Sequence, residues 1–208
     1  MARYTGPRVR LSRRFNTPLF GSSKYLERKP YPPGVHGQKR RRKATDYALA
    51  LAEKQKMRYY YGLMEKQFRG IYEKAIRRRG VTGEIMLQIL ETRLDSVVYS
   101  LGFGYTRAQA RQMVTHGHVL VNGKRARTPS IAMNEGHKVE IKHTEKSRHL
   151  ADKNLEYSTS RTVPEWLEVD KAAYTGSVKR KPTREDIEPV ANEQTIVEFY
   201  SRQSLGPG

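Results

Sequence analysis

Hydrophobic residues recur at helical spacing through the middle of the chain. Between Glu65 and Arg79 they fall at i, i+3, i+4, i+7 and i+8, which predicts a helix with one buried face. A second stripe follows Thr82 and predicts one continuous helix over residues 82–101, closed by Gly102. The two stripes consist of Phe68, Ile71, Tyr72, Ala75 and Ile76, and of Met86, Ile89, Leu90, Leu94, Val97, Val98 and Leu101.

Two further helices are predicted from their end signals. Thr45 is a suitable cap for a helix that reaches about Tyr61, before Gly62. Thr106 and Gln109 have the spacing of a capping box. Gly117 fits the end of that second helix.

A hairpin and a strand are expected after Gly117. Asn122 and Gly123 suit the positive φ angles of a two-residue turn, which would fold Lys124 and Arg125 back toward the preceding helix. Residues 138–142 alternate between polar and apolar side chains, as a half-buried strand does. We therefore expect an α+β fold in which helices precede a small antiparallel sheet.

The composition of the chain indicates that its partner is a polyanion. Lys and Arg total 40 against 21 Asp and Glu, which gives a formal net charge of +19. Residues 1–43 hold 13 of these basic side chains and the single acid Glu27, so the charge is concentrated near the N-terminus. Only 37% of the residues are hydrophobic, so we expect a modest, divided core that is completed in part by the partner.

The first 43 residues suit RNA better than a membrane. Arginines that can pair with phosphates alternate with aromatic residues that can stack on bases or pack locally. Five prolines argue against an amphipathic helix lying on lipid. Together with the interleaved aromatic residues they favour a shaped arm, although we do not expect this arm to fold alone. A disordered basic tail or a nuclear-targeting patch is the alternative interpretation.

Several classes of protein are disfavoured by what the sequence lacks. No apolar run reaches transmembrane length and the chain opens with no hydrophobic signal segment, so we expect a cytoplasmic protein. There is no cysteine, and His116 and His118 lie two residues apart around a glycine, so we expect no metal site and no cofactor. Trp166 is expected to fill an apolar gap.

Motifs spread along the chain, among them Tyr31–Arg40, Glu91–Tyr99, His116–Val119 and Glu198–Arg202, are typical of one known family. By these motifs the chain resembles the family of bacterial small-subunit ribosomal protein four. The resemblance is densest from Glu91 to Gly123 and extends over nearly the full length. A similar middle module occurs in pseudouridine synthases and some tRNA synthetases, so the separated matches carry the comparison. They are Ala2–Pro7, Tyr31–Arg40, Asp46–Tyr47, Glu53–Lys56, Glu65–Phe68, Glu91–Tyr99, Leu101–Phe103, Arg107, Ala110–Gln112, His116–Val119, Val121–Gly123, Asn192–Gln194 and Glu198–Arg202.

The resemblance implies a domain organisation and a set of partners. It implies a basic arm and helical rRNA-binding domain over residues 1–90, with residues 190–208 packed back on it. An RNA-binding module with a C-terminal extension, residues 91–189, would be inserted between them. The implied role is structural and not catalytic: early binding to a junction in the 5′ domain of small-subunit rRNA, with assembly nucleated there. It further implies contact with small-subunit protein five, proximity to the passage by which mRNA enters, an influence on decoding accuracy and, in some members, repression of their own operon message.

One departure from the family concerns the arm. Many relatives carry a four-cysteine zinc site there, whereas this chain has Val9 and Ser12 where the first two cysteines would fall. The arm is therefore expected to take its shape from packing and RNA contacts instead of zinc.

The candidate binding residues are mostly cations, with polar side chains at turns. Arg93 and the terminal arginines of the predicted helices could equally be satisfied by neighbouring protein groups. The expected protein interface comprises Asn192, Glu193, Phe199 and Tyr200. The expected RNA-binding residues are Arg3, Tyr4, Arg8, Arg10, Arg13, Arg14, His36, Gln38, Lys39, Arg40, Arg41, Arg42, Lys54, Arg58, Arg69, Arg93, Arg107, Arg111, Gln112, His116, His118, Asn122, Lys124, Arg125, Lys146, Arg148 and Arg202.

Two alternatives remain at this stage. An RNA-modifying enzyme could carry the same module, but residues 150–208 offer a short acidic stretch and no evident catalytic pocket. A DNA-binding regulator would instead show sequence-dependent binding to duplex DNA.

Overall fold

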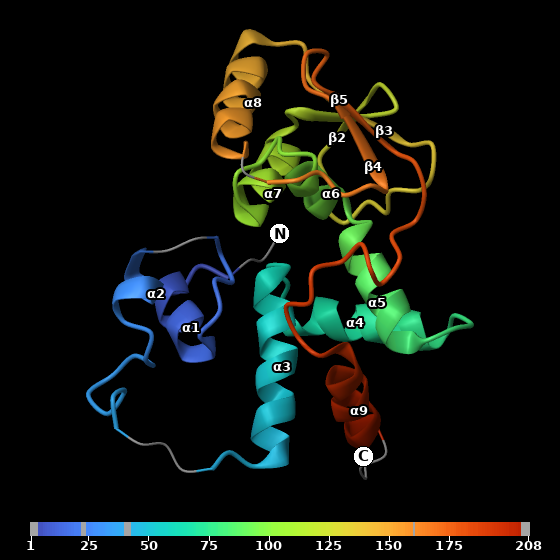
Figure 1. Cartoon of the computed structure of the whole chain (residues 1–208). Helices are drawn as coiled ribbons and strands as arrows, with labels where there is room; N and C mark the ends of the chain where they lie inside the picture. The colour runs from blue at the N-terminus through green and yellow to red at the C-terminus, as the bar shows by residue number, and fades with distance from the viewer. Residues whose placement is uncertain (1–3, 22–23, 40–42, 160, 205–208) are drawn as a thin grey trace. The chain divides into compact units, whose positions relative to one another are not determined.

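The computed structural model describes residues 4–21, 24–39, 43–159 and 161–204, which form two compact units. The first unit comprises the described residues up to Gly83 together with those from Pro189 onward, and the second spans Glu84–Glu188. The chain therefore leaves the first unit, completes the second and then returns, as the colours of Figure 1 show. The functional division at residue 90 stays a prediction.

The N-terminal arm contains two short helices, α1 (Arg8–Phe15) and α2 (Lys24–Arg28). Pro7 precedes α1, where its missing amide proton costs nothing, and Asn16 ends the helix with a φ of 49°. Arg13 ties the arm together because its Nε donates to the carbonyls of Lys29 and Tyr31, both at 3.1 Å.

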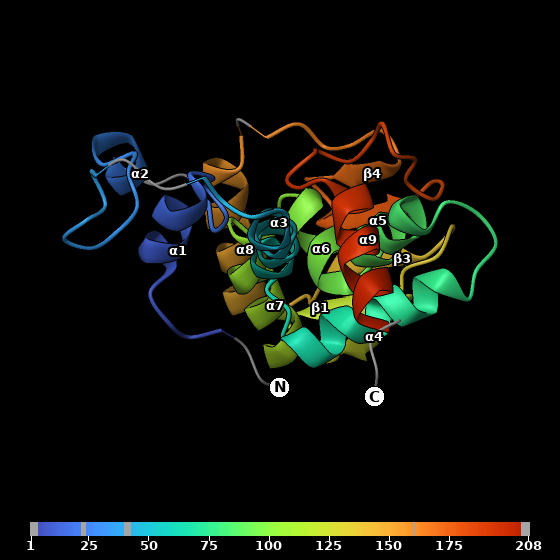
Figure 2. The same ribbon diagram turned by 90° about the horizontal axis from the view of Figure 1, so that it is seen from below.

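The helical core of the first unit is formed by α3 (Asp46–Tyr60), α4 (Glu65–Ile76) and α9 (Glu193–Ser204). The Thr45 hydroxyl accepts from the amide of Ala48, so the predicted cap of α3 is confirmed. α9 packs along α3 (Figures 1 and 2), and the rings of Tyr72 and Tyr200 stack with centroids 4.7 Å apart. α9 thus covers apolar residues of α3 and α4, which lie more than a hundred positions earlier in the sequence.

The predicted buried face of α4 ends one position early. Phe68, Ile71, Tyr72 and Ala75 are buried, whereas Ile76 is 52% exposed and the helix stops there instead of at Arg79. Hydrophobic periodicity shows which positions share one face of a helix. A position is buried only where a neighbouring element covers that face, and Ile76 is not covered.

The predicted helix over residues 82–101 is broken into α5 (Thr82–Glu91) and α6 (Leu94–Ser100). The prediction of a continuous helix was therefore wrong. At the break, the backbone takes partners from the segment near Met133: the Met133 amide donates to the Thr92 carbonyl at 2.7 Å, and the Leu94 amide donates to the Ile131 carbonyl at 2.9 Å. These tertiary hydrogen bonds replace helical ones at the break. The stripe residues of α6, which include Leu94 and Val98, lie in the core of the second unit, and Met86 and Leu90 of α5 are buried as well.

The second unit combines α6, α7 (Arg107–His116) and α8 (Glu145–Tyr157) with a five-stranded antiparallel sheet, which confirms the α+β prediction. The strands are β1 (Val119–Val121), β2 (Lys124–Ala126), β3 (Lys138–Ile141), β4 (Leu167–Asp170) and β5 (Thr175–Val178). Their order in the sheet is β2-β1-β3-β5-β4.

The local signals predicted around α7 are present. The Thr106 hydroxyl accepts from the Gln109 amide, and Gly117 ends the helix with a φ of 72°. Asn122 and Gly123 have φ angles of 49° and 75°, so the turn between β1 and β2 forms as predicted.

Trp166 lies in the core of the second unit. Its side chain is 1% exposed and belongs to the cluster that contains Phe103 and Met133, as predicted from its apolar surroundings in the sequence. Among the described residues, no helix is both long and apolar enough to cross a membrane.

Candidate nucleic-acid interface

The arginine pattern of the second unit is organised around one buried carboxylate. Asp95 accepts from Nε and Nη2 of Arg93, both at 3.0 Å, and from Nη1 of Arg111 at 2.9 Å. It also accepts from the amide of Ser96 at 3.1 Å. All three charged side chains are buried, so this network joins the α5–α6 break to α7 inside the protein.

Arg107 is held on the neighbouring turn of α7. Its guanidinium donates to Ser96 Oγ and to Glu91 Oε1, both at 2.9 Å, and lies over the ring of Tyr99 with a centroid distance of 4.6 Å. The structure thus places Arg93, Arg107 and Arg111 in internal ion pairs. Their contact with RNA stays a prediction.

A cluster of basic groups surrounds the C-terminal end of α7. The Arg125 guanidinium donates to the carbonyls of His116 and Gly117, at 3.1 and 3.2 Å, and so satisfies two groups at the negative end of the helix. The Lys142 amide donates to the His118 carbonyl at 2.8 Å, which brings that lysine beside the histidine. We call His116, His118, Arg125 and Lys142 the α7-end cluster.

The electrostatics of the α7-end cluster are strongly positive. Burial lowers the pKa of the His118 imidazole below its ordinary value of 6.5, and the charges of His116, Arg125 and Lys142 lower it further. His118 Nδ1 lies 2.9 Å from Ser147 Oγ, which fixes the ring against α8. The cluster therefore presents a field suited to phosphate groups at the junction of α7, β2 and α8.

Exposed cations extend this field onto the hairpin and onto α8. Lys124, Lys146 and Arg148 are exposed, although the Arg148 guanidinium also contacts His143 Nδ1 at 2.6 Å and lies over the Tyr174 ring. Gln112 is exposed on α7. Asn122 has a structural function, because its side-chain oxygen accepts from the amide of Lys138 at 2.8 Å. Among the residues predicted in this region, Lys124 on the hairpin and Lys146 and Arg148 on α8 therefore present positive charge to solvent.

Replacing Gly117 by alanine tests how the α7-end cluster is held. A Cβ at this position would both adopt a strained φ of 72° and collide with the Arg125 guanidinium, so we expect a loss of about 1–3 kcal/mol in the free energy of unfolding. Gly123→Ala is the matched control, because its φ is 75° but the space around it is open. If denaturant titrations gave the same loss in the free energy of unfolding for both variants, the close approach of Arg125 to Gly117 would contribute nothing to stability.

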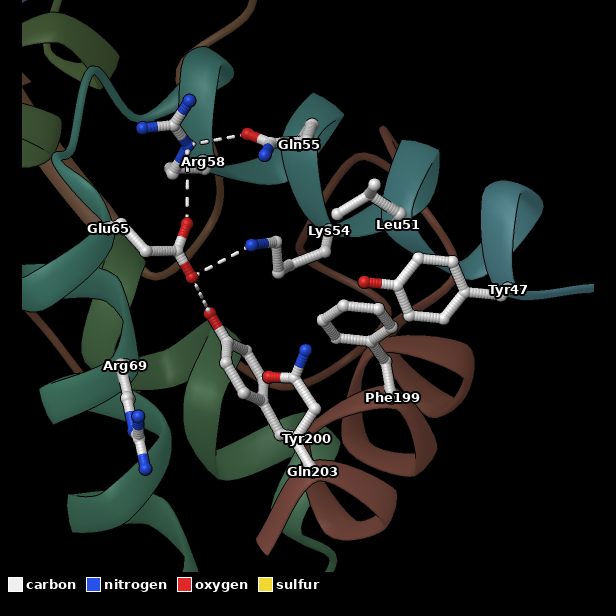
Figure 3. A pocket seen from close by; sticks show the side chains of 10 residues that line it. All are labelled: Tyr47, Leu51, Lys54, Gln55, Arg58, Glu65, Arg69, Phe199, Tyr200 and Gln203. Atoms are coloured by element: carbon white, nitrogen blue, oxygen red, sulfur yellow. Dashed lines mark hydrogen bonds and ion pairs between the residues drawn. The ribbon is translucent and has the colours of Figure 1, made fainter. Parts of the chain in front are cut away.

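The predicted cations of the first unit meet at a pocket of about 440 Å³ between α3, α4 and α9 (Figure 3). Lys54 Nζ donates to Glu65 Oε1 at 2.8 Å, and the Tyr200 hydroxyl donates to the same oxygen at 2.7 Å. Arg58 Nε donates to Gln55 Oε1 at 2.7 Å and lies 3.7 Å from Glu65 Oε2. Lys54 is thus buried and paired, whereas Arg69 on the pocket's edge is exposed beside Glu73, at 3.4 Å.

Glu65 gives the first unit a dependence on pH. Burial raises the pKa of its carboxyl, but hydrogen bonds from Lys54 and Tyr200 and the charges of Lys54 and Arg58 lower it by more, so the net pKa lies below 4.5. A depressed native pKa contributes stability above the unfolded-state value, which is lost as the pH falls through the native pKa. We expect Glu65→Gln to lower the thermal midpoint at pH 7, and the difference from the unmodified protein to shrink below pH 4.5. A difference that is constant from pH 7 to pH 3 would contradict this.

The predicted protein-interface residues are used largely within the first unit. Phe199 and Tyr200 are buried, with the Phe199 ring 5.5 Å from that of Tyr47. Asn192 caps α9 by accepting from the amide of Thr195 at 3.1 Å, and the side chain of Glu193 packs against Gly83. These contacts account for all four side chains, and their contact with another protein stays a prediction.

The arm residues fall into two groups. Tyr4 packs edge-on against Tyr59 at 5.1 Å, and Arg8 and Arg13 lie over the rings of Phe20 and Tyr31. The remaining described candidates are exposed: Arg10, Arg14, His36, Gln38 and Lys39, together with Arg202 on α9. Arg3, Arg40, Arg41 and Arg42 lie outside the described residues.

Lys142 and Arg161 are absent from the sequence-based candidates. Lys142 could have been found from strand pairing, because the register of Val119 with Ile141 places the next residue beside His118. Arg161 has no comparable signal: it follows α8 in an irregular segment, and its partners are the distant carbonyls of Tyr99, Gly104 and Tyr105.

The basic charge and the two units indicate a protein of the RNA-binding class, and comparison with known proteins agrees with this. Residues 92–139 match the S4 domain, and residues 3–91 match the Ribosomal protein S4/S9 N-terminal domain. The chain is 52% identical to small ribosomal subunit protein uS4 of Akkermansia muciniphila, over 97% of this chain and 100% of the relative. Identity is 54% to the uS4 protein of Opitutus terrae and 46% to that of Thermus thermophilus, with the same coverage. The chain belongs to the uS4 family of small ribosomal subunit proteins.

Proposed function

We propose that this protein is a structural constituent of the small ribosomal subunit that binds small-subunit rRNA and catalyses no reaction. The observation that carries the proposal is similarity over the full length to proteins named as uS4, joined to a net charge of +19. The alternative of an RNA-modifying enzyme is not favoured, because the relatives that match along the whole chain bear ribosomal protein names.

The structure supports a division of labour among the basic residues. Exposed cations such as Lys124, Lys146 and Arg148 neutralise phosphates and release counterions. Arg93 and Arg111 act through Asp95, because their ion pairs hold α7 in place beneath the α7-end cluster. On this proposal the exposed cations supply most of the affinity for RNA, and the buried arginines hold the binding surface in its shape.

We further propose that the RNA is a multi-helix junction of the 5′ domain, recognised mainly by shape, and that binding there nucleates assembly in the cytoplasm. Small-subunit protein five and mRNA are the proposed neighbours, with an effect on translational accuracy.

A salt titration tests the proposed interface. We expect the combined variant Lys124→Ala, Lys146→Ala and Arg148→Ala to bind a 5′-domain rRNA transcript at least tenfold more weakly at 0.1 M salt. The slope of log K against log salt should fall by about 2–3, because up to three phosphate contacts are lost.

A matched control removes the same charge from the opposite edge of the sheet. Lys171→Ala, Lys179→Ala and Lys181→Ala alter exposed lysines beside β4 and β5, whereas Lys124 lies on β2. If the two triple variants weakened RNA binding equally, the proposed face would not be the RNA-binding surface. If the unmodified protein bound tRNA or duplex DNA as tightly as the rRNA transcript, the proposed function itself would fail.

A further inference from the structure

Two exposed tyrosines form a pair on the second unit. Tyr105 lies in the loop before α7 and is 41% exposed, and Tyr157 is the last residue of α8 and is 59% exposed. Their ring centroids are 5.5 Å apart and the ring planes are tilted by 55°. Such a pair places two large aromatic surfaces next to each other in solvent.

The backbone beneath this pair is fixed by a chain of hydrogen bonds that runs from the exposed loop to a buried asparagine. Gln109 Oε1 accepts from the amide of Tyr105 at 3.1 Å, while its Nε2 donates to Asn154 Oδ1 at 2.7 Å. Asn154 is buried on α8, and its Nδ2 donates to the carbonyl of Phe103 at 2.8 Å. The loop and the helix end are therefore held together before any ligand binds, which lowers the entropic cost of binding.

A cation lies beside the backbone of Tyr105. Arg161 donates from Nη1 to the carbonyl of Tyr99 and from Nη2 to that of Tyr105, both at 3.0 Å, and its guanidinium lies 3.9 Å from the centroid of the Tyr99 ring. Carbonyl groups and an aromatic ring carry no net charge, so these contacts leave the positive charge of Arg161 available to an anion. Lys153, one turn before Tyr157, is an exposed cation, and Glu156 is an exposed acid of the same turn.

We propose that Tyr105, Tyr157 and Arg161 form a stacking platform for an unpaired base of the bound RNA, with the adjoining phosphate near Arg161. Exposed aromatic rings beside an arginine are the combination that single-stranded nucleic acid uses, and paired bases have their faces already covered. Because the rings are tilted, one base stacks on an outer ring face instead of inserting between them. The proposal rests on the proposed rRNA-binding function and adds a site for a single-stranded nucleotide to it.

The test compares tyrosine variants in binding to the 5′-domain rRNA transcript. The double variant Tyr105→Ala and Tyr157→Ala should bind about tenfold more weakly, with an unchanged salt slope because no charge is removed. The double variant Tyr105→Phe and Tyr157→Phe should bind within about twofold of the unmodified protein, because it keeps the ring faces. Ultraviolet crosslinking of the unmodified complex, mapped by mass spectrometry, should place a nucleotide adduct on one of the tyrosines even if the alanine variant folds poorly.

Each other outcome has a distinct meaning. Failure of the unmodified protein to bind the transcript would sink the proposed function, whereas normal binding by a folded alanine variant would overturn the platform alone. Equal weakening by the phenylalanine and alanine variants would assign the effect to the hydroxyl groups and overturn stacking. Normal RNA affinity with reduced incorporation into small subunits would assign the pair to a protein neighbour. Adducts on other residues but on neither tyrosine would also overturn the platform.

Discussion

Replacing Asp95 by alanine is expected to lower the free energy of unfolding of the second unit by about 3–5 kcal/mol. The Asp95 carboxylate accepts hydrogen bonds from both Arg93 and Arg111, whose side chains are almost as buried as its own. Without Asp95, two guanidinium groups would remain in a site that water barely reaches. Guanidinium titrations followed by the fluorescence of Trp166, the single tryptophan, report directly on this unit.

An exposed ion pair of the same unit provides the control for Asp95. Glu168 lies 3.7 Å from Lys179 with both side chains largely exposed, so Glu168→Ala should cost less than about 1 kcal/mol. If Asp95→Ala were no more destabilising than Glu168→Ala, the buried arginines would not depend on this carboxylate. RNA affinity should fall together with stability in Asp95→Ala, although Asp95 itself carries a negative charge.

Replacing Trp166 by alanine is expected to cost about 3–5 kcal/mol. The side chain is fully enclosed by core residues that include Phe103 and Val178, so its removal leaves a cavity as well as less buried apolar surface. The Trp166 carbonyl also accepts from the amide of Lys179 at 2.9 Å, at the start of the β4–β5 pair. Loss of the indole should therefore loosen that edge of the sheet first.

Circular dichroism at increasing temperature measures the effect of Trp166→Ala, since the fluorescent group is lost. Tyr157→Ala is the control, because this ring is exposed and its removal should change the free energy of unfolding by less than about 0.5 kcal/mol. A Trp166→Ala variant with the thermal midpoint of the control would show that the core closes around the missing ring.

Local signals predicted the fold best where a few neighbouring residues decide the conformation. Thr106, Gly117 and the Asn122–Gly123 turn each impose their geometry through their own backbone angles or caps, and α7 and the hairpin formed as predicted. The break at Thr92–Arg93 could not be predicted in this way, because its hydrogen-bond partners come from residues near 132. Strands β4 and β5 were also not anticipated, since each has four residues and gains stability from pairing with a distant strand.

The candidate site was predictable in its chemistry but not in its detailed arrangement. Charge identified the class of ligand, and the spacing of Arg107 and Arg111 placed them correctly on one helix. Whether an arginine faces solvent or a carboxylate depends on which acid the fold brings close, and Asp95 reaches Arg111 across 16 positions of sequence. The exposed Tyr105–Tyr157 pair was missed for the same reason, because its two members come from different elements.

The first unit is built from two segments of the chain that are separated by the second unit. This arrangement determines which unit can finish folding first during synthesis. Residues of α9 such as Ile196 and Phe199 belong to the first unit's core, yet the ribosome adds them after the whole of the second unit. The second unit can close as soon as its own last strand has emerged, while α3 and α4 wait with part of their apolar surface uncovered. A nascent chain halted before Asn192 should thus hold one folded unit and one that a chaperone can still bind.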